Sequence, residues 1–104
     1  MKIPIRKKWG QNFLIDPNII RKIISVLNPE KNQNILEIGP GKGALTTKLV
    51  EMDLNISAIE IDPMLCEYLK DKKLNNVKIY NADILKFDVS MMPQDYMVIG
   101  NLPY

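Results

Sequence analysis

Polar residues follow four short apolar runs of this chain, and together they could bind and act on a nucleoside. The first run, Asn34 to Ile38, leads into the loop Gly39-Pro40-Gly41-Lys42-Gly43, and the later runs end at Glu60, Asp83 and Asn101. If these runs are parallel strands, their carboxyl ends meet at one edge of a sheet, where open α/β folds bind ligands. The sequence therefore predicts one crevice that contains all four features.

The glycine loop and Glu60 fit two classes of cofactor. Glycines let a loop turn tightly and let a ligand lie against its backbone. Gly39, Gly41 and Gly43 read as G-x-G-x-G, whereas Gly39, Gly41 and Ala44 satisfy the dinucleotide fingerprint G-x-G-x-x-A. A carboxylate at Glu60 can accept both ribose hydroxyls of either ligand. A purely structural turn is the alternative for the loop.

Asp83 favours a compact nucleoside over a dinucleotide. A carboxylate at the third strand end can accept a hydrogen bond from an adenine amino group and so place adenine beside the ribose. The alternative is that Asp83 caps the turn at Ile84-Leu85, as Asp62 is expected to cap a helix that begins at Pro63.

The final residues, Gly100-Asn101-Leu102-Pro103-Tyr104, suit methyl transfer to an adenine amine. The lone pair of that nitrogen is delocalised into the ring. The Asn101 side-chain oxygen and the Leu102 carbonyl can accept its two N–H groups and aim the lone pair at an electrophilic methyl group. Tyr104 offers a ring on which the base can stack. A simple Asn-x-Pro turn is the alternative.

Strands alternate with helices along the chain, which predicts a doubly wound, mostly parallel α/β sheet. Asp16-Pro17 begins an amphipathic helix over residues 17–27. Further helices are expected over about 44–52 and from Pro63, and strands over 34–38, 56–61, 77–80 and 96–99. Residues 84–94 are expected to form a loop that packs Met91 and Met92 into the core.

Composition narrows the class of protein. The 104 residues suffice for one small domain, and no apolar run approaches the ~20 residues that cross a bilayer. The chain has no histidine and one cysteine, Cys66, which argues against a metal site and fits a reducing cytosol.

Positive charge is concentrated in an N-terminal arm. Of the 14 Lys and Arg residues, four lie within residues 1–10, which leaves 10 against 12 Asp and Glu. Such an arm is either a solvated tail or a contact for phosphates, and Trp9 within it could stack on a base.

Several motifs, in this order and spacing, resemble the ribosomal RNA adenine N6,N6-dimethyltransferases. They are GQNFL (10–14), EIGPGKGALT (37–46), AIEID (58–62), ADIL (82–85) and GNLPY (100–104). GQNFL and NLPY in one chain are highly specific, whereas EIGPG is shared with many methyltransferases.

The resemblance implies S-adenosylmethionine as cofactor and no metal. It places Asn12 and Leu14 against the cofactor, Gly39 at its methionine part, Glu60 at its ribose, Asp83 at its adenine and Asn101 beside the transferred methyl group. Residues 1–15 would form the basic, cofactor-contacting arm, and 16–104 a partial methyltransferase domain cut off after its fourth strand. The protein would be a cytoplasmic monomer without a membrane partner.

The expected substrate is ribosomal RNA in the immature small ribosomal subunit. One alternative within the family is a large-subunit enzyme that confers macrolide resistance. Outside it, the alternatives are a nicotinamide-dependent dehydrogenase half and a non-catalytic remnant that binds nucleosides or RNA.

Overall fold

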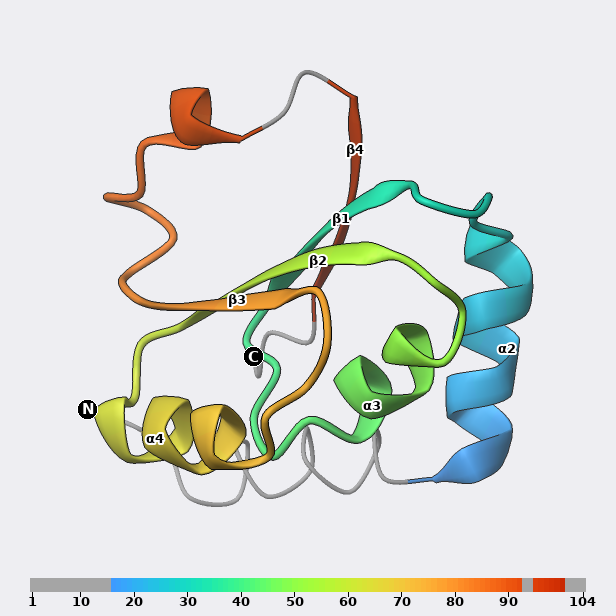
Figure 1. Ribbon diagram of the computed structural model, residues 1–104, viewed down its shortest axis with the longest axis horizontal. Coiled ribbons are helices and arrows are strands. Elements are labelled where there is room, and N and C mark those ends of the chain that lie inside the picture. Colours follow the sequence, from blue (N-terminus) through green and yellow to red (C-terminus); the bar gives the residue numbers. More distant parts are fainter. Residues whose placement is uncertain (1–15, 93–94, 101–104) are drawn as a thin grey trace.

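The computed structural model describes residues 16–92 and 95–100 and confirms the α/β fold (Figure 1). Its centre is a sheet of four parallel strands in the order β3-β2-β1-β4. The strands are β1 (Asn34–Ile38), β2 (Asn55–Glu60), β3 (Val77–Asn81) and β4 (Tyr96–Gly100). Each lies within one residue, at either end, of the strand expected from the sequence.

The order of the strands creates a switch point between β1 and β4. After β1 the chain adds β2 and β3 on one side, then returns to place β4 on the other side of β1. Ile38 at the end of β1 pairs with Ile59 of β2 and with Gly100 of β4. Ligands of doubly wound sheets bind at such a reversal, outside the carboxyl ends of the strands.

The first described helix, α2 (Pro17–Leu27), begins and ends as its sequence predicts. The Asp16 carboxylate accepts a hydrogen bond from the Asn18 N–H at 2.9 Å, and Pro17 occupies the first helical position. Asn28 then adopts a left-handed conformation, and its N–H donates to the Ile24 carbonyl. Pro29 follows, so the helix cannot continue.

Two shorter helices link the first three strands. Helix α3 (Ala44–Val50) ends two residues before the expected Met52, in a turn over residues 51–53. Helix α4 (Pro63–Asp71) begins with Asp62, whose side chain accepts from the Met64 N–H at 2.9 Å. The predicted capping role of Asp62 is therefore confirmed.

The hydrophobic core lies between the sheet and the helices α2 and α3. Ile20 of α2 and Leu45 and Leu49 of α3 cluster with Ile35 of β1 and Ile56 of β2, all at most 5% exposed. Burial of this kind supplies most of the stability of a small domain. No helix in the described ranges is long and apolar enough to cross a membrane.

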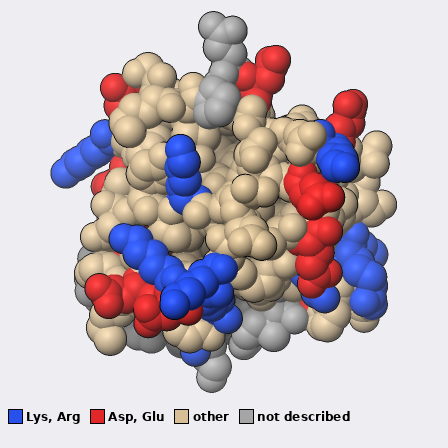
Figure 2. Space-filling view, in the orientation of Figure 1, with Lys and Arg blue, Asp and Glu red and all other residues tan. Residues whose placement is uncertain are grey.

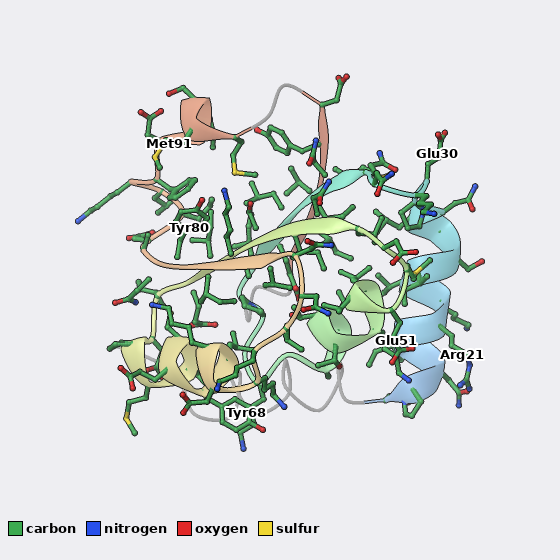
Figure 3. The ribbon with its side chains drawn as sticks, viewed as in Figure 1. Arg21, Glu30, Glu51, Tyr68, Tyr80 and Met91 are labelled. Carbon is green, nitrogen blue, oxygen red and sulfur yellow. The ribbon has the colours of Figure 1, made fainter. Side chains whose placement is uncertain are left out.

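The connection between β3 and β4 differs from the expectation at Met91. A single 3-10 turn, η1 (Val89–Met91), begins at Asp88, whose side chain accepts from the Ser90 N–H at 3.0 Å. This turn lies away from the sheet, and Met91 is 64% exposed (Figure 3). The prediction that Met91 packs into the core is therefore wrong. An aromatic pair fixes the connection instead, because the Phe87 ring packs edge-on against Tyr80 of β3 at 5.2 Å.

Candidate functional site

The carboxyl ends of three strands meet at one edge of the sheet. The Gly39 N–H donates to the Ile59 carbonyl at 2.9 Å, so the glycine loop leaves β1 directly beside the end of β2. The Ala82 N–H donates to the Glu60 carbonyl at 3.1 Å, which brings the end of β3 to the other side of β2. Gly39, Glu60 and Asp83 are therefore neighbours along one edge, as the sequence predicts.

The loop between β1 and α3 uses left-handed backbone at its glycines. Gly43 has φ of 87°, and a β-carbon there would lie 2.7 Å from Cδ2 of the buried Leu69. Gly41 has φ of 59°, but a β-carbon there would meet no atom of the described residues within 4 Å. Gly43 thus serves the packing of the loop against α4, whereas Gly41 borders open space in which a ligand could lie.

Glu60 holds the glycine loop in place. Its carboxylate accepts from the Gly41 N–H through Oε1 at 3.1 Å and from the Asp62 N–H through Oε2 at 3.0 Å. The side chain is only 6% exposed. Each carboxylate oxygen can accept a second hydrogen bond, so Glu60 keeps capacity for ligand hydroxyls.

Two residues that the sequence analysis did not assign fix the turn after Glu60. The Asn81 side-chain amide donates to the carbonyls of Glu60 and Ile61, each at 3.1 Å. The Cys66 thiol of α4 donates to the same Glu60 carbonyl at 3.3 Å, and burial raises the pKa of that thiol. The sequence does offer one sign of this role of Asn81, because Asn81 is a polar residue at the very end of β3.

Glu37, the last but one residue of β1, is a further group that the sequence analysis did not assign. It is 1% exposed, and Oε1 accepts a hydrogen bond from the Thr46 hydroxyl of α3 at 2.5 Å. Oε2 is buried and finds no hydrogen-bond partner among the described residues. Burial raises the pKa of Glu37 to about 7, the Thr46 hydrogen bond lowers it, and the nearby Glu60 charge raises it. The signal was an acidic residue inside an otherwise apolar strand.

Asp83 caps a turn, as the alternative interpretation proposed. One carboxylate oxygen accepts from the Leu85 N–H at 3.0 Å. The side chain is half-buried, and this contact uses only part of its acceptor capacity. The capping role and a ligand role are therefore compatible at this position.

The remaining predicted site residues lie outside the described residues. They are Asn12, Leu14, Asn101, Leu102 and Tyr104. Gly100, the last described residue, lies beside Ile38 at the same edge as the glycine loop. Within residues 16–92 and 95–100, no three His, Cys, Asp or Glu side chains gather as metal ligands would.

A hollow lies at the opposite edge of the sheet, near the amino ends of β1 and β4. It is open and polar, and its walls carry none of the predicted site residues. The residues that line it are Glu30, Lys31, Asn32, Gln33, Asp95 and Tyr96. Because strand ends at the carboxyl edge carry the glycine loop and the carboxylates, we place the candidate site there.

Comparison with solved structures supports the same fold. A dimethyladenosine transferase from Plasmodium falciparum superimposes with a TM-score of 0.74 and 30% identity, over 86% of this chain and 33% of that one. The 23S rRNA methyltransferase ErmE gives a TM-score of 0.76 and 32% identity, over 88% of this chain and 38% of that one.

Curated relatives are more similar in sequence. The "Ribosomal RNA small subunit methyltransferase A" of Coxiella burnetii is 43% identical over 99% of this chain. The protein of the same name from Aromatoleum aromaticum is 45% identical over 95% of this chain. The chain spans about two fifths of the length of these relatives, 42% and 38% respectively.

A model of one protein family matches nearly the whole chain. The model of the family described as "Ribosomal RNA adenine dimethylase" aligns with residues 3–104. That range includes the glycine loop, Glu60 and Asp83, and it extends through the final tyrosine. The chain belongs to the ribosomal RNA adenine dimethylase family.

Proposed function

We propose that this chain binds S-adenosylmethionine for the N6,N6-dimethylation of adenines in small-subunit ribosomal RNA. One observation carries the proposal: the glycine loop, Glu60 and Asp83 lie together at the carboxyl edge of β1, β2 and β3. The relatives named as small-subunit methyltransferases are 43–45% identical to it and support the choice of substrate.

The described residues fit an adenosine-type cofactor. Beside Gly41, a β-carbon would meet nothing within 4 Å in the part of the chain that the structure describes, which leaves room for a ligand. Glu60 would accept the ribose hydroxyls, and Asp83 would accept from the adenine amino group while it caps its turn. When bound, S-adenosylmethionine supplies an electrophilic methyl group. The protein's own contribution is to orient the cofactor and the target base.

The target base would be held by the final residues of the chain. Asn101 and the Leu102 carbonyl would accept the two N–H groups of the adenine amine, and Tyr104 would stack on the base. These roles, and the contacts of Asn12 and Leu14 with the cofactor, remain predictions from the sequence. No ionised base is needed, because the amine becomes acidic once it is methylated.

The RNA would be contacted by the basic arm at Lys2 to Lys8. On the face shown in Figure 2, basic and acidic side chains are interspersed, and neither sign covers a broad area. Since the body is nearly neutral and the arm is cationic, residues 1–15 would make most of the phosphate contacts. Residues 16–104 would bind the cofactor together with Asn12 and Leu14 of the arm. The immature small subunit in the cytoplasm would be the partner, and the protein would act as a monomer.

A large-subunit substrate is the second candidate, because ErmE, named as a 23S rRNA methyltransferase, is 32% identical to this chain with the same fold. An assay with both RNA substrates distinguishes the two candidate functions. A protein that carries this chain, at the full length of its relatives, is assayed for transfer of labelled methyl groups to immature small subunits and to large-subunit RNA. Methylation of small subunits alone supports the proposal, and methylation of large-subunit RNA alone contradicts it.

Asn101→Ala in the same assay tests the catalytic assignment. We expect activity to fall while S-adenosylmethionine still binds, because Asn101 is proposed to orient the target amine. Lys31→Ala, on the opposite edge of the sheet, serves as the control. Undiminished activity of Asn101→Ala would remove this residue from the mechanism.

A further inference from the structure

Glu37 is a buried acid that the proposed chemistry does not use. It lies in β1 two residues before the glycine loop, and its carboxyl group bonds to Thr46 in the first turn of α3. This hydrogen bond joins the strand before the glycine loop to the helix after it. Within residues 16–92 and 95–100, Oε2 is buried without a hydrogen-bond partner, which is costly for an ionised carboxylate.

The electrostatic neighbours of Glu37 come from β2 and α3. Of the described titratable groups, Glu60 acts on it and disfavours its negative charge, whereas the Thr46 hydroxyl favours that charge. With its pKa near 7, Glu37 holds a proton in a large fraction of molecules at neutral pH. A positive charge placed near Glu37 and Glu60 would favour loss of that proton.

The proposed cofactor would bring such a charge to this position. Its sulfonium sulfur joins the ribose to the methionine part. Glu60 is proposed to hold the ribose and Gly39 the methionine part, so the positive charge would lie between these two positions. Glu37 is near both, because it precedes Gly39 by two residues and the charge of Glu60 acts on it. S-adenosylhomocysteine, the product, has the same two parts but a neutral sulfur.

We propose that Glu37 is a specificity-determining residue that releases its proton when the cationic cofactor binds, and so favours S-adenosylmethionine over S-adenosylhomocysteine. The inference rests on the proposed function. The O–H bond of the carboxylic acid breaks, the proton passes to the buffer, and the resulting buried carboxylate is stabilised by the positive charge of the sulfonium. Above neutral pH the carboxylate is already present, so the preference for the cationic ligand rises with pH.

Calorimetry on the 104-residue chain tests this directly. Each ligand is titrated at pH 7 in phosphate and in Tris, whose different ionisation enthalpies reveal the number of protons released. We expect S-adenosylmethionine to release up to about half a proton more than S-adenosylhomocysteine, since a group with pKa near 7 is about half protonated there. The affinity ratio of the two ligands should rise roughly threefold or more between pH 6 and 8.

Two variants serve as matched controls. Glu37→Gln is nearly isosteric and should abolish both the difference in proton release and the pH dependence of the ratio. Thr46→Val keeps the acid but removes the hydroxyl that favours its charge, so the proton release should move to higher pH. If Glu37 had only a structural role, both variants would show the same proton release and the same pH dependence of the affinity ratio as the wild type.

Carbon-13 NMR of the Glu37 carboxyl group in the unmodified chain gives the same test without a variant. The titration midpoint should be near 7 in the free protein and should fall with S-adenosylmethionine, but much less with S-adenosylhomocysteine. Equal proton release for both ligands, or a titration midpoint that does not change with the ligand, would overturn this inference but not the proposed function. If neither ligand binds, the proposed function fails as well.

Discussion

Replacement of Glu37 by glutamine should make the stability of the chain less dependent on pH. Burial raises the pKa of this carboxyl group from 4.5 to about 7, so the folded state binds its proton more tightly than the unfolded state does. The contribution of Glu37 to stability is thus fully present below pH 4.5 and is lost as the pH rises through about 7. Glutamine cannot ionise and carries no such dependence.

The size of this change in the free energy of unfolding follows from the raised pKa of Glu37. The interval from 4.5 to about 7, at about 1.4 kcal/mol for each pH unit, corresponds to about 3 kcal/mol. The free energy of unfolding of Glu37→Gln, minus that of wild type, should therefore rise by about 2 to 3 kcal/mol between pH 5 and pH 8. Other titrating groups are common to both proteins and cancel in this difference.

Urea unfolding followed by circular dichroism at pH 5, 6, 7 and 8 measures this difference. Glu51→Gln makes the same substitution at an exposed position just after α3 and controls for the chemistry of the change (Figure 3). A difference between Glu37→Gln and wild type that stays constant with pH would refute the assignment of a buried, protonated acid at this position.

Two further predictions use matched pairs of residues. Gly43→Ala should lower the free energy of unfolding by about 2 to 4 kcal/mol, because its β-carbon would meet Leu69 at 2.7 Å, whereas Gly41→Ala should cost only about 1 to 2 kcal/mol of backbone strain. Equal losses in urea unfolding would contradict this reading of the loop. Asp83→Ala should weaken S-adenosylmethionine binding about tenfold or more by calorimetry, whereas Asp88→Ala, which removes a similar cap on an exposed turn, should not. Similar affinities for both variants would leave Asp83 with its capping role only.

Local signals in the sequence were sufficient to predict the elements of the fold. The Asp-Pro pairs at 16–17 and 62–63 each placed the start of a helix at the correct residue. The strands were predictable because each is a short apolar run bounded by turn residues. The parallel arrangement then followed from the alternation of strands with helices.

Contacts between distant segments could not be read from the sequence. Periodicity shows that Glu60 ends a strand, but not that its carboxylate accepts from the Gly41 N–H, 19 positions earlier. It also gives no sign that Thr46 reaches back to Glu37. Met91 was mispredicted for a related reason. An apolar side chain in an irregular segment packs inward only if the backbone carries it over the sheet, and η1 does not.

Calorimetric titration of the chain with S-adenosylmethionine and, separately, with NAD shows which cofactor the carboxyl edge of the sheet binds. If the ends of β1, β2 and β3 form one adenosine site, S-adenosylmethionine binds and NAD does not. Glu60→Ala should then weaken S-adenosylmethionine binding by about tenfold or more, because hydrogen bonds from the ribose to a carboxylate are lost. Preference for NAD, or unchanged affinity in Glu60→Ala, would contradict the account.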